Sequence, residues 1–167
     1  MIEHRKIRST TILGVRSKGK VAVAGDGQVT LGDMAMKQKA VKVRKCDSQK
    51  GGVVGGFAGA AADALTLFEK FEQKLDEYEG DLKRSVVEMA KDWRTDKILR
   101  HLEALLLVMD KRDSFIIAGD GNVIEPDGAI VSIGSGGGFA QSAATAFLQS
   151  GKYSAKQIAE KSLKIAA

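Results

Sequence analysis

The stretch TTILGVRSKGKVAVA, residues 10–24, predicts the first two strands of the fold. Residues 10–15 alternate weakly between apolar and polar side chains, and Lys20–Ala24 alternates clearly, as half-buried strands do. The segment Ser17-Lys18-Gly19 between them is typical of a turn. We therefore expect two strands joined as a hairpin, with Thr10 and Thr11 at the start of the first.

Further strands are expected beyond this hairpin. Asp26-Gly27 predicts a tight turn into residues 28–31, because aspartate and glycine tolerate positive φ. Residues 40–44 (AVKVR) alternate again. Residues 52–58 (GVVGGFA) are typical of a buried strand, and glycine inside a strand often marks a close approach of another group.

The apolar period changes to three or four residues from about residue 60. One predicted helix carries Leu65, Phe68, Phe71, Leu75 and Tyr78 on a single face and ends at Gly80. Asp81 is the expected N-cap of a second helix, whose apolar stripe is Leu82, Val86, Met89 and Trp93. The short joint between the two helices predicts antiparallel neighbours.

Strands and then helices return in the second half of the chain. The expected strands cover residues 105–109, 115–118 and 129–133, with turns at 110–113 and at Asp120-Gly121. The glycine cluster 134–138 leads into a helix over 139–148, and Ser154 is the expected cap of a last helix that continues to residue 167.

The order of these elements predicts the fold class. Strands, two helices, strands and two helices follow one another, and AGDGQV (24–29) is echoed by AGDGNV (118–123) at a second hairpin. Two sheets packed face to face, with a helix pair on each outer face, would bury every apolar stripe. We expect an α+β protein with a four-layer α-β-β-α sandwich.

Composition narrows the classes of function. The length of 167 residues is typical of one domain. The net charge of +5 is dispersed along the chain and aromatic residues make up only 5%, so we expect no nucleic-acid-binding surface. Cys46 has no second cysteine with which to pair, which indicates a reducing compartment. The longest strongly apolar run, residues 104–109, is too short to cross a membrane. We expect a cytoplasmic protein.

Histidine-based and metal-based chemistry find little support in the sequence. His4 and His101 are isolated, and neither C-x-x-C nor H-E-x-x-H occurs. The GSGGG cluster at 134–138 resembles an anion cradle at a helix start, so a nucleotide-binding module is one alternative. Tight packing of strand and helix is the reading that we favour for these glycines.

Thr10 offers a different chemistry. A threonine hydroxyl becomes a nucleophile when an N-terminal amine takes its proton. The pKa of such an amine, roughly 7.7–8, falls further beside a cation such as Lys42. The amine exists only if the bond from Ser9 to Thr10 is cut, which would give the basic segment Met1–Ser9 a purpose as a leader. The alternative is an ordinary strand threonine that follows a tail.

A resemblance to a known family favours the first reading. The matching segments are TTI (10–12), AGDGQVTLG (24–32), KVRK (42–45), GFAG (56–59), ADALTLFEKFEQKL (62–75), AKDWRTDK (90–97), LEALL (102–106) and IGSGG (133–137). Together they closely resemble the HslV (ClpQ) family of bacterial peptidases, which are relatives of the proteasome β subunits and N-terminal-nucleophile hydrolases.

The resemblance implies a set of catalytic residues. Thr10 would supply both the nucleophilic hydroxyl and the general-base amine, Asp26 and Lys42 would form an ion pair beside it, and Gly59 would donate its backbone N–H to an oxyanion. Ser135 would orient the amine or a water that carries protons. Two of these residues have a plainer role as an alternative: Asp26 would only shape its turn, and Gly59 would only let a helix start close to the sheet.

The resemblance also implies an assembly. The family forms two stacked hexameric rings that work with an HslU-type ATPase ring on unfolded protein substrates; a non-catalytic or unprocessed ring subunit is the rival reading. Peptide hydrolysis requires no cofactor, although the family holds a sodium ion through backbone oxygens, of which Ala167 is the first and the only one present here. A further strand beyond the last helix is missing, and two residues are added between Lys45 and Gly56, which lengthens the turn at 50–52.

Overall fold

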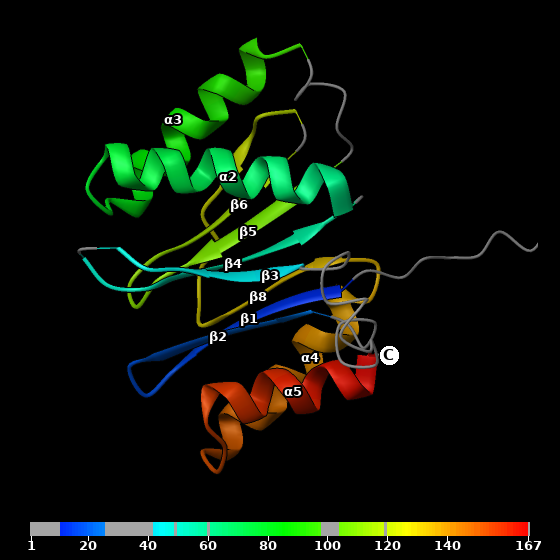
Figure 1. Ribbon diagram of the computed structural model, residues 1–167. Coiled ribbons are helices and arrows are strands. Elements are labelled where there is room, and N and C mark those ends of the chain that lie inside the picture. The colour runs from blue at the N-terminus through cyan, green and yellow to red at the C-terminus, as the bar shows by residue number, and fades with distance from the viewer. Residues whose placement is uncertain are drawn as a thin grey trace, which may run out of the picture.

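The structure, a computed structural model, describes residues 11–25, 42–48, 50–59, 61–97, 104–118 and 120–166. The elements are β1 (Thr11–Ser17), β2 (Lys20–Gly25), β3 (Val43–Cys46), β4 (Val53–Ala58), α2 (Ala61–Glu77), α3 (Leu82–Thr95), β5 (Leu105–Met109), β6 (Ser114–Ala118), β7 (Val123–Ile124), β8 (Ile130–Gly134), α4 (Gly137–Ser150) and α5 (Ala155–Ala166). Figure 1 shows them in four layers, with α2 and α3 on one sheet and α4 and α5 on the other. The predicted α-β-β-α sandwich is confirmed.

The two sheets differ in width. Among the described residues, one sheet has three strands in the order β2-β1-β8 and the other has five in the order β3-β4-β5-β6-β7, and every pair is antiparallel. β1 lies at the centre of the smaller sheet, where Ile12 pairs with Gly25 and Thr11 pairs with Gly134. The first strand of the sequence is therefore held on both sides.

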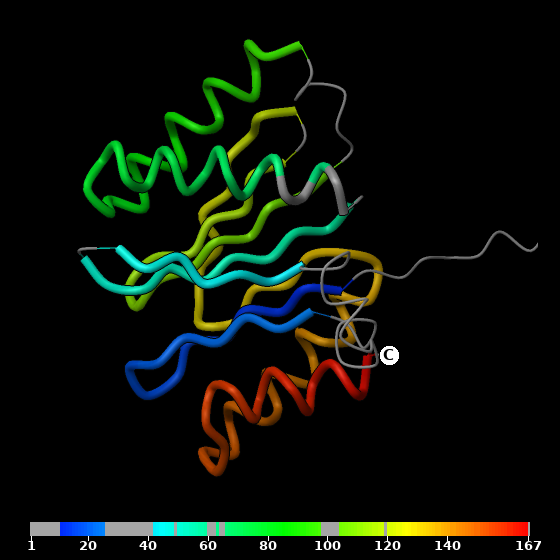
Figure 2. The backbone as a smooth tube through the Cα atoms, in the orientation of Figure 1, coloured from blue at the N-terminus to red at the C-terminus, as the bar shows by residue number. Residues whose placement is uncertain are grey.

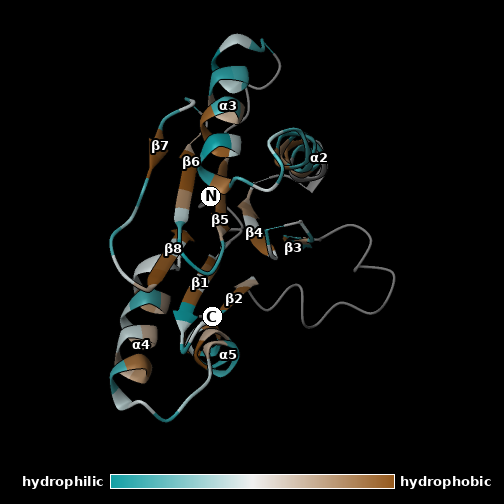
Figure 3. Cartoon of the chain, turned by 90° about the vertical axis from the view of Figure 1, so that its left-hand side faces the viewer, coloured by the Kyte–Doolittle hydropathy of each residue, from teal (hydrophilic) through white to brown (hydrophobic). Residues whose placement is uncertain are grey.

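Three apolar clusters fill the spaces between the four layers. In Figure 3 the strands at the centre are coloured largely as hydrophobic, whereas the helices carry both hydrophobic and hydrophilic residues. The cluster under α2 and α3 includes Phe57, Phe68, Phe71 and Trp93, and the cluster over α4 and α5 includes Leu13 and Ile158. Between the sheets lie Ile12, Leu107, Met109, Val131 and Ile133. The apolar period of each segment thus decides which layer boundary it fills.

Glycines in the strands allow the sheets to approach each other. A Cβ on Gly56 of β4 would overlap the Ile12 side chain of β1 and lie 3.2 Å from Val23 Cγ1. A Cβ on Gly14 of β1 would overlap the Met109 side chain. The close approach that the GVVGGFA segment predicts is therefore made by side chains of the facing sheet.

Arg16 ties the two sheets together at the far end of β1. Its guanidinium donates to the carbonyl oxygens of Asp110 and Asp113, at 3.0 and 2.7 Å from Nη2, and to Ser114 Oγ at 2.7 Å. Asp110 in turn accepts hydrogen bonds from two backbone amides of the β5–β6 turn. The predicted hairpin at 110–113 is confirmed, and it serves as the acceptor for this arginine.

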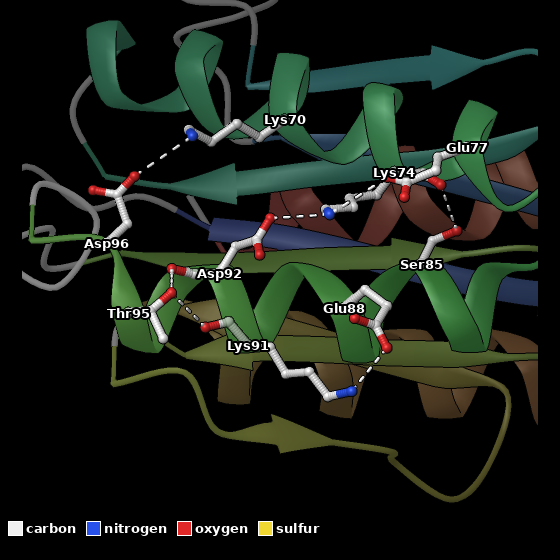
Figure 4. A network of polar contacts seen from close by, with 9 residues as sticks. All are labelled: Lys70, Lys74, Glu77, Ser85, Glu88, Lys91, Asp92, Thr95 and Asp96. Carbon is white, nitrogen blue, oxygen red and sulfur yellow. Dashed lines mark hydrogen bonds and ion pairs between the residues drawn. The ribbon is translucent and has the colours of Figure 1, made fainter.

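The helix pair α2–α3 is antiparallel, as predicted, and polar contacts cross it (Figure 4). Lys74 Nζ lies 3.1 Å from an Asp92 carboxylate oxygen, and Lys70 Nζ lies 3.6 Å from Asp96. The hydrogen bond to Asp92 raises the pKa of Lys74. Asp81 caps α3 by accepting from the Arg84 amide at 3.0 Å, which confirms the predicted N-cap.

Several element boundaries differ from the sequence-based expectation. The strand predicted over 40–44 begins only at Val43, so Lys42 precedes it, and it continues to Cys46. In the connection between β3 and β4, the Gly51 amide donates to the Ser48 carbonyl oxygen at 3.1 Å. β7 was not expected, and α4 starts two residues early, at Gly137. Ser154 Oγ accepts a hydrogen bond from the Gln157 amide, which confirms the predicted cap of α5. The strand predicted at 28–31 lies outside the described residues.

Candidate active site

The first described residue of β1, Thr11, is only 1% exposed and pairs with Gly134 at the end of β8. The predicted nucleophile, Thr10, lies outside the described residues, but a peptide bond joins it to Thr11. The environment of Thr11 therefore defines the place at which the predicted chemistry would occur.

Lys42 packs beside Gly25 at this end of the molecule. Gly25 closes β2 opposite Ile12, and a Cβ built on it would lie 3.6 Å from Lys42 Cβ and 3.4 Å from Val43 Cγ2. The Lys42 carbonyl accepts a hydrogen bond from the Phe57 amide at 2.8 Å. Lys42 is thus anchored to β4 and packed beside the end of β2; Asp26, its predicted partner, lies outside the described residues.

Gly59 directly follows β4 and is exposed. Its φ of 152° is a value that favours glycine, so the chain leaves the sheet here in a conformation that other residues seldom adopt. Gly56, three residues before Gly59, packs against Ile12. Ile12 in turn is two residues after Thr10. Gly59 consequently lies at the same end of the sandwich as the start of β1.

Ser135 is exposed and stands between two glycines with distinct roles. Gly134 has a φ of 94° at the end of β8, and Gly136 is the N-cap residue of α4. A Cβ on Gly136 would overlap Thr11 Oγ1 and lie 3.5 Å from the Ala166 carbonyl oxygen. Ser135 therefore sits directly beside the contact between β1 and α4.

These positions converge although they are far apart in the sequence. In Figure 2 the start of β1, the end of β2 and the end of α5 lie on one side of the molecule, away from the β1–β2 turn. The structure brings together Lys42, Gly59, Ser135 and the described neighbours of Thr10 and Asp26. It does not describe Thr10, Asp26 or Ala167 themselves.

The electrostatic setting suits a neutral amine. The N-terminus of a helix carries a partial positive charge, and α4, a helix of 14 residues, begins beside Thr11. Lys42 adds a cation in the same region. Both would disfavour protonation of an α-amino group placed there and so lower its pKa.

Metal ligands of the usual kind do not gather in the described ranges. Among residues 11–25, 42–48, 50–59, 61–97, 104–118 and 120–166, no group of three or more His, Cys, Asp or Glu side chains could hold a metal ion. A cation bound by backbone oxygens would begin at Ala167, which lies outside those ranges.

Sequence reasoning missed two glycines at this site. Gly136 leaves no room for a Cβ beside Thr11 Oγ1, and Gly25 packs beside Lys42 at an ordinary contact distance; neither was singled out. The GSGGG segment did predict tight packing of strand and helix, but a run of glycines does not show which one faces a neighbour. The packing explanation of the GSGGG cluster holds for Gly136 and for Gly137, whose Cβ would lie 3.1 Å from Ser132 Oγ.

Comparison with known proteins agrees with this geometry. Residues 7–167 match the proteasome subunit family, so the chain belongs to that family. It is 55% identical over 162 residues, 97% of this chain and 90% of the relative, to the ATP-dependent protease subunit HslV of Treponema denticola. The resemblance to HslV seen in the sequence is confirmed.

Solved structures give the same result for the fold. The crystal structure of HslV from Trypanosoma brucei superposes with a TM-score of 0.78 at 46% identity, covering 94% of this chain and 90% of the other. Thiobacillus denitrificans BPH in complex with epoxomicin matches with a TM-score of 0.66 at 22% identity, over 95% and 90% of the two chains, which bears on the fold alone. In the part of the chain described here, no helix has the length and apolarity needed to cross a membrane.

Proposed function

We propose that this chain is the threonine endopeptidase subunit of an ATP-dependent protease, with Thr10 as the nucleophile once residues 1–9 are removed. The observation that carries the proposal is the convergence of Lys42, Gly59 and Ser135 on the start of β1 in a chain that is 55% identical to an HslV subunit. Residues 10–167 form the peptidase domain in this account.

The reaction needs only the chain's own groups and water. The Thr10 amine takes the proton from the Thr10 hydroxyl, and the oxygen attacks the substrate carbonyl carbon. The Gly59 N–H stabilises the oxyanion that forms, a contribution typically worth about 10²–10³ in rate. The protonated amine then gives its proton to the departing amine of the substrate, which leaves an ester on Thr10.

Water completes the cycle. The neutral amine takes a proton from a water molecule that attacks the ester, and the carboxylate product leaves as the hydroxyl is restored. Lys42, paired with Asp26, would keep the amine deprotonated by its charge. Ser135 would orient the amine or the attacking water. This scheme uses no cofactor.

We propose that the chain assembles into two stacked hexameric rings and works with an HslU-type ATPase ring on unfolded proteins in the cytoplasm. The Treponema denticola relative is itself named as a subunit of an ATP-dependent protease. An unselective peptidase is harmless to folded proteins when its sites face an enclosed chamber. The lone cysteine, Cys46, suits a reducing compartment.

The direct test replaces Thr10 with alanine. Thr10→Ala should lower peptide hydrolysis by at least about a thousandfold and leave residues 1–9 attached, because the hydroxyl is lost. Thr145→Ala, in an exposed position on α4, is the matched control and should hydrolyse and process normally. Normal turnover by Thr10→Ala would refute the proposal.

The rival reading, a non-catalytic or unprocessed ring subunit, predicts a different result. In that case the assembled wild-type protein would retain Met1–Ser9 and would hydrolyse no faster than Thr10→Ala. Addition of the ATPase and ATP separates the two readings further, since only the catalytic subunit would then degrade an unfolded protein substrate.

A further inference from the structure

Thr11 occupies an unusual position for a polar residue. It is the first described residue of β1, its side chain is 1% exposed, and its Oγ1 faces the backbone of Gly136 at the start of α4. Threonine is also stiff about χ1, because it is branched at Cβ. A buried, stiff side chain at this point holds the backbone of β1 in a fixed relation to α4.

Gly136 leaves room for the Thr11 side chain because it has no Cβ. A Cβ there would overlap Thr11 Oγ1 and would lie 3.4 Å from Thr11 Cβ. The backbone of Gly136 has φ −88° and ψ 4°, which any residue can adopt, so the requirement for glycine is steric. The end of α5 closes the contact, because the Ala166 carbonyl oxygen lies 3.5 Å from the same point.

A new chain end at Thr10 would need such a contact. Terminal residues are poorly ordered unless they are tied down, and a misplacement of about 1 Å at a reacting group can cost about 10²-fold in rate. After leader removal, one peptide bond would join the nucleophile to the rest of the chain, and that bond leads to Thr11. Backbone pairing with Gly134 fixes the strand, and the side chain in contact with Gly136 fixes its rotation.

We propose that Thr11 is a positioning residue, whose side chain packed against Gly136 holds the amine and hydroxyl of Thr10 in their reactive geometry. The inference rests on the proposed function, since it assumes that Thr10 is the nucleophile. It assigns no chemistry to Thr11 itself. It also assigns Gly136 a specific role within the glycine cluster at 134–138.

The experiment compares two glycines of the same helix start. Gly136→Ala places a methyl group against Thr11, whereas a Cβ on Gly138 meets no atom of the described residues within 4 Å. In the processed enzyme, Gly136→Ala should lower kcat by about 10–100-fold with KM changed by less than about twofold. Gly138→Ala, the matched control, should keep both constants and the rate of leader removal.

The pH profile separates positioning from a general loss of stability. When the Thr10 amine moves away from Lys42 and the start of α4, its pKa should rise toward the ordinary value of about 7.7–8. The acid limb of kcat/KM should therefore shift to higher pH in Gly136→Ala and stay in place in Gly138→Ala. A uniform loss of active protein would lower the whole profile without moving that limb.

A second pair of variants keeps the inference testable if Gly136→Ala does not fold. Thr11→Ser retains the hydroxyl that faces Gly136 and should keep kcat within about threefold, while Thr11→Ala empties this space and should lower kcat at least tenfold. If Thr11→Ala matches the wild type in kcat and pH profile while Thr10→Ala is inactive, the inference fails and the proposed function stands. Activity in Thr10→Ala would overturn the function itself.

Discussion

Cys46 shows how the surroundings of one residue set its chemistry. The thiol is 5% exposed at the end of β3 and donates to Glu72 Oε1 at 3.5 Å. Burial, followed by the charge of Glu72, raises the pKa of the thiol from 9.0 to about 12. The thiolate is the reactive form of cysteine, so Cys46 is not a candidate nucleophile near neutral pH.

Alkylation should reveal this protection. At pH 8 the thiolate fraction of Cys46 should be about a thousandfold below that of an ordinary cysteine, so iodoacetamide should label the native protein at least 100-fold more slowly than the urea-unfolded protein. Glu72→Gln should lower the pKa and speed labelling of the native state. A labelling rate that levels off near pH 9 in the native wild type would contradict the assignment.

At the scale of single elements, Arg16 has an effect beyond its own strand. β1 belongs to the three-stranded sheet, yet its arginine satisfies three acceptors in the β5–β6 hairpin of the other sheet. A hydrogen bond that involves a charged group typically contributes about 1.5–3 kcal/mol, and such contributions do not simply add when one group makes several bonds. β1 is thus fixed by Arg16 at one end and by Thr11 at the other.

Replacement of Arg16 should measure this connection. Arg16→Met should lower the free energy of unfolding by about 2–3 kcal/mol, because the partly buried carbonyl oxygens of the turn lose their charged donor. Lys20→Met on the neighbouring strand removes the same charge from an exposed position and should change it by less than about 0.5 kcal/mol. Denaturant titration gives both values, and equal effects would show that Arg16 does not connect the sheets.

The elements themselves could largely be predicted from periodicity. Helices α2 and α3 follow their apolar stripes, and Asp81 and Gly80 mark their joint as expected. β7 escaped prediction because two residues form a strand only through their pairing with β6. Lys42 was predicted to lie inside a strand because the alternating pattern of AVKVR starts at residue 40, whereas the ladder of β3 with β4 starts only at Val43.

At the scale of the whole molecule, the separation of the two sheets decides whether the site forms. Ile12 lies against Gly56 across the sheet interface. Ile12 is two residues after Thr10, and Gly56 is three residues before Gly59. Gly14 makes a similar contact with the end of the Met109 side chain. A thioether can move aside more easily than a β-branched isoleucine.

Alanine at the two positions should therefore have unequal effects. Gly56→Ala should cost about 1–3 kcal/mol of stability and should also lower peptidase activity, because it pushes Ile12 away from its place beside the site. Gly14→Ala should cost less and leave activity closer to that of the wild type. The comparison by thermal unfolding and peptide hydrolysis would contradict this account if Gly14→Ala proved the more damaging change.

The site as a whole depends on contacts that a sequence pattern does not contain. The layered fold follows from local periodicity and from the need to bury each apolar face. Thr11 contacts Gly134 of β8 and Gly136 at the start of α4, the end of α5 lies against Gly136, and only the folded chain brings these segments together. The family resemblance pointed to Lys42, Gly59 and Ser135, whereas the steric role of Gly136 could be seen only in the structure.

The most direct measurement is the intact mass of the active enzyme. Purified protein that hydrolyses peptides should lack residues 1–9 and begin with Thr10, and activity should rise in proportion to the fraction of processed chains. Full activity in protein that still carries Met1–Ser9 would contradict the account, because an amide nitrogen at Thr10 cannot accept the proton of its own hydroxyl.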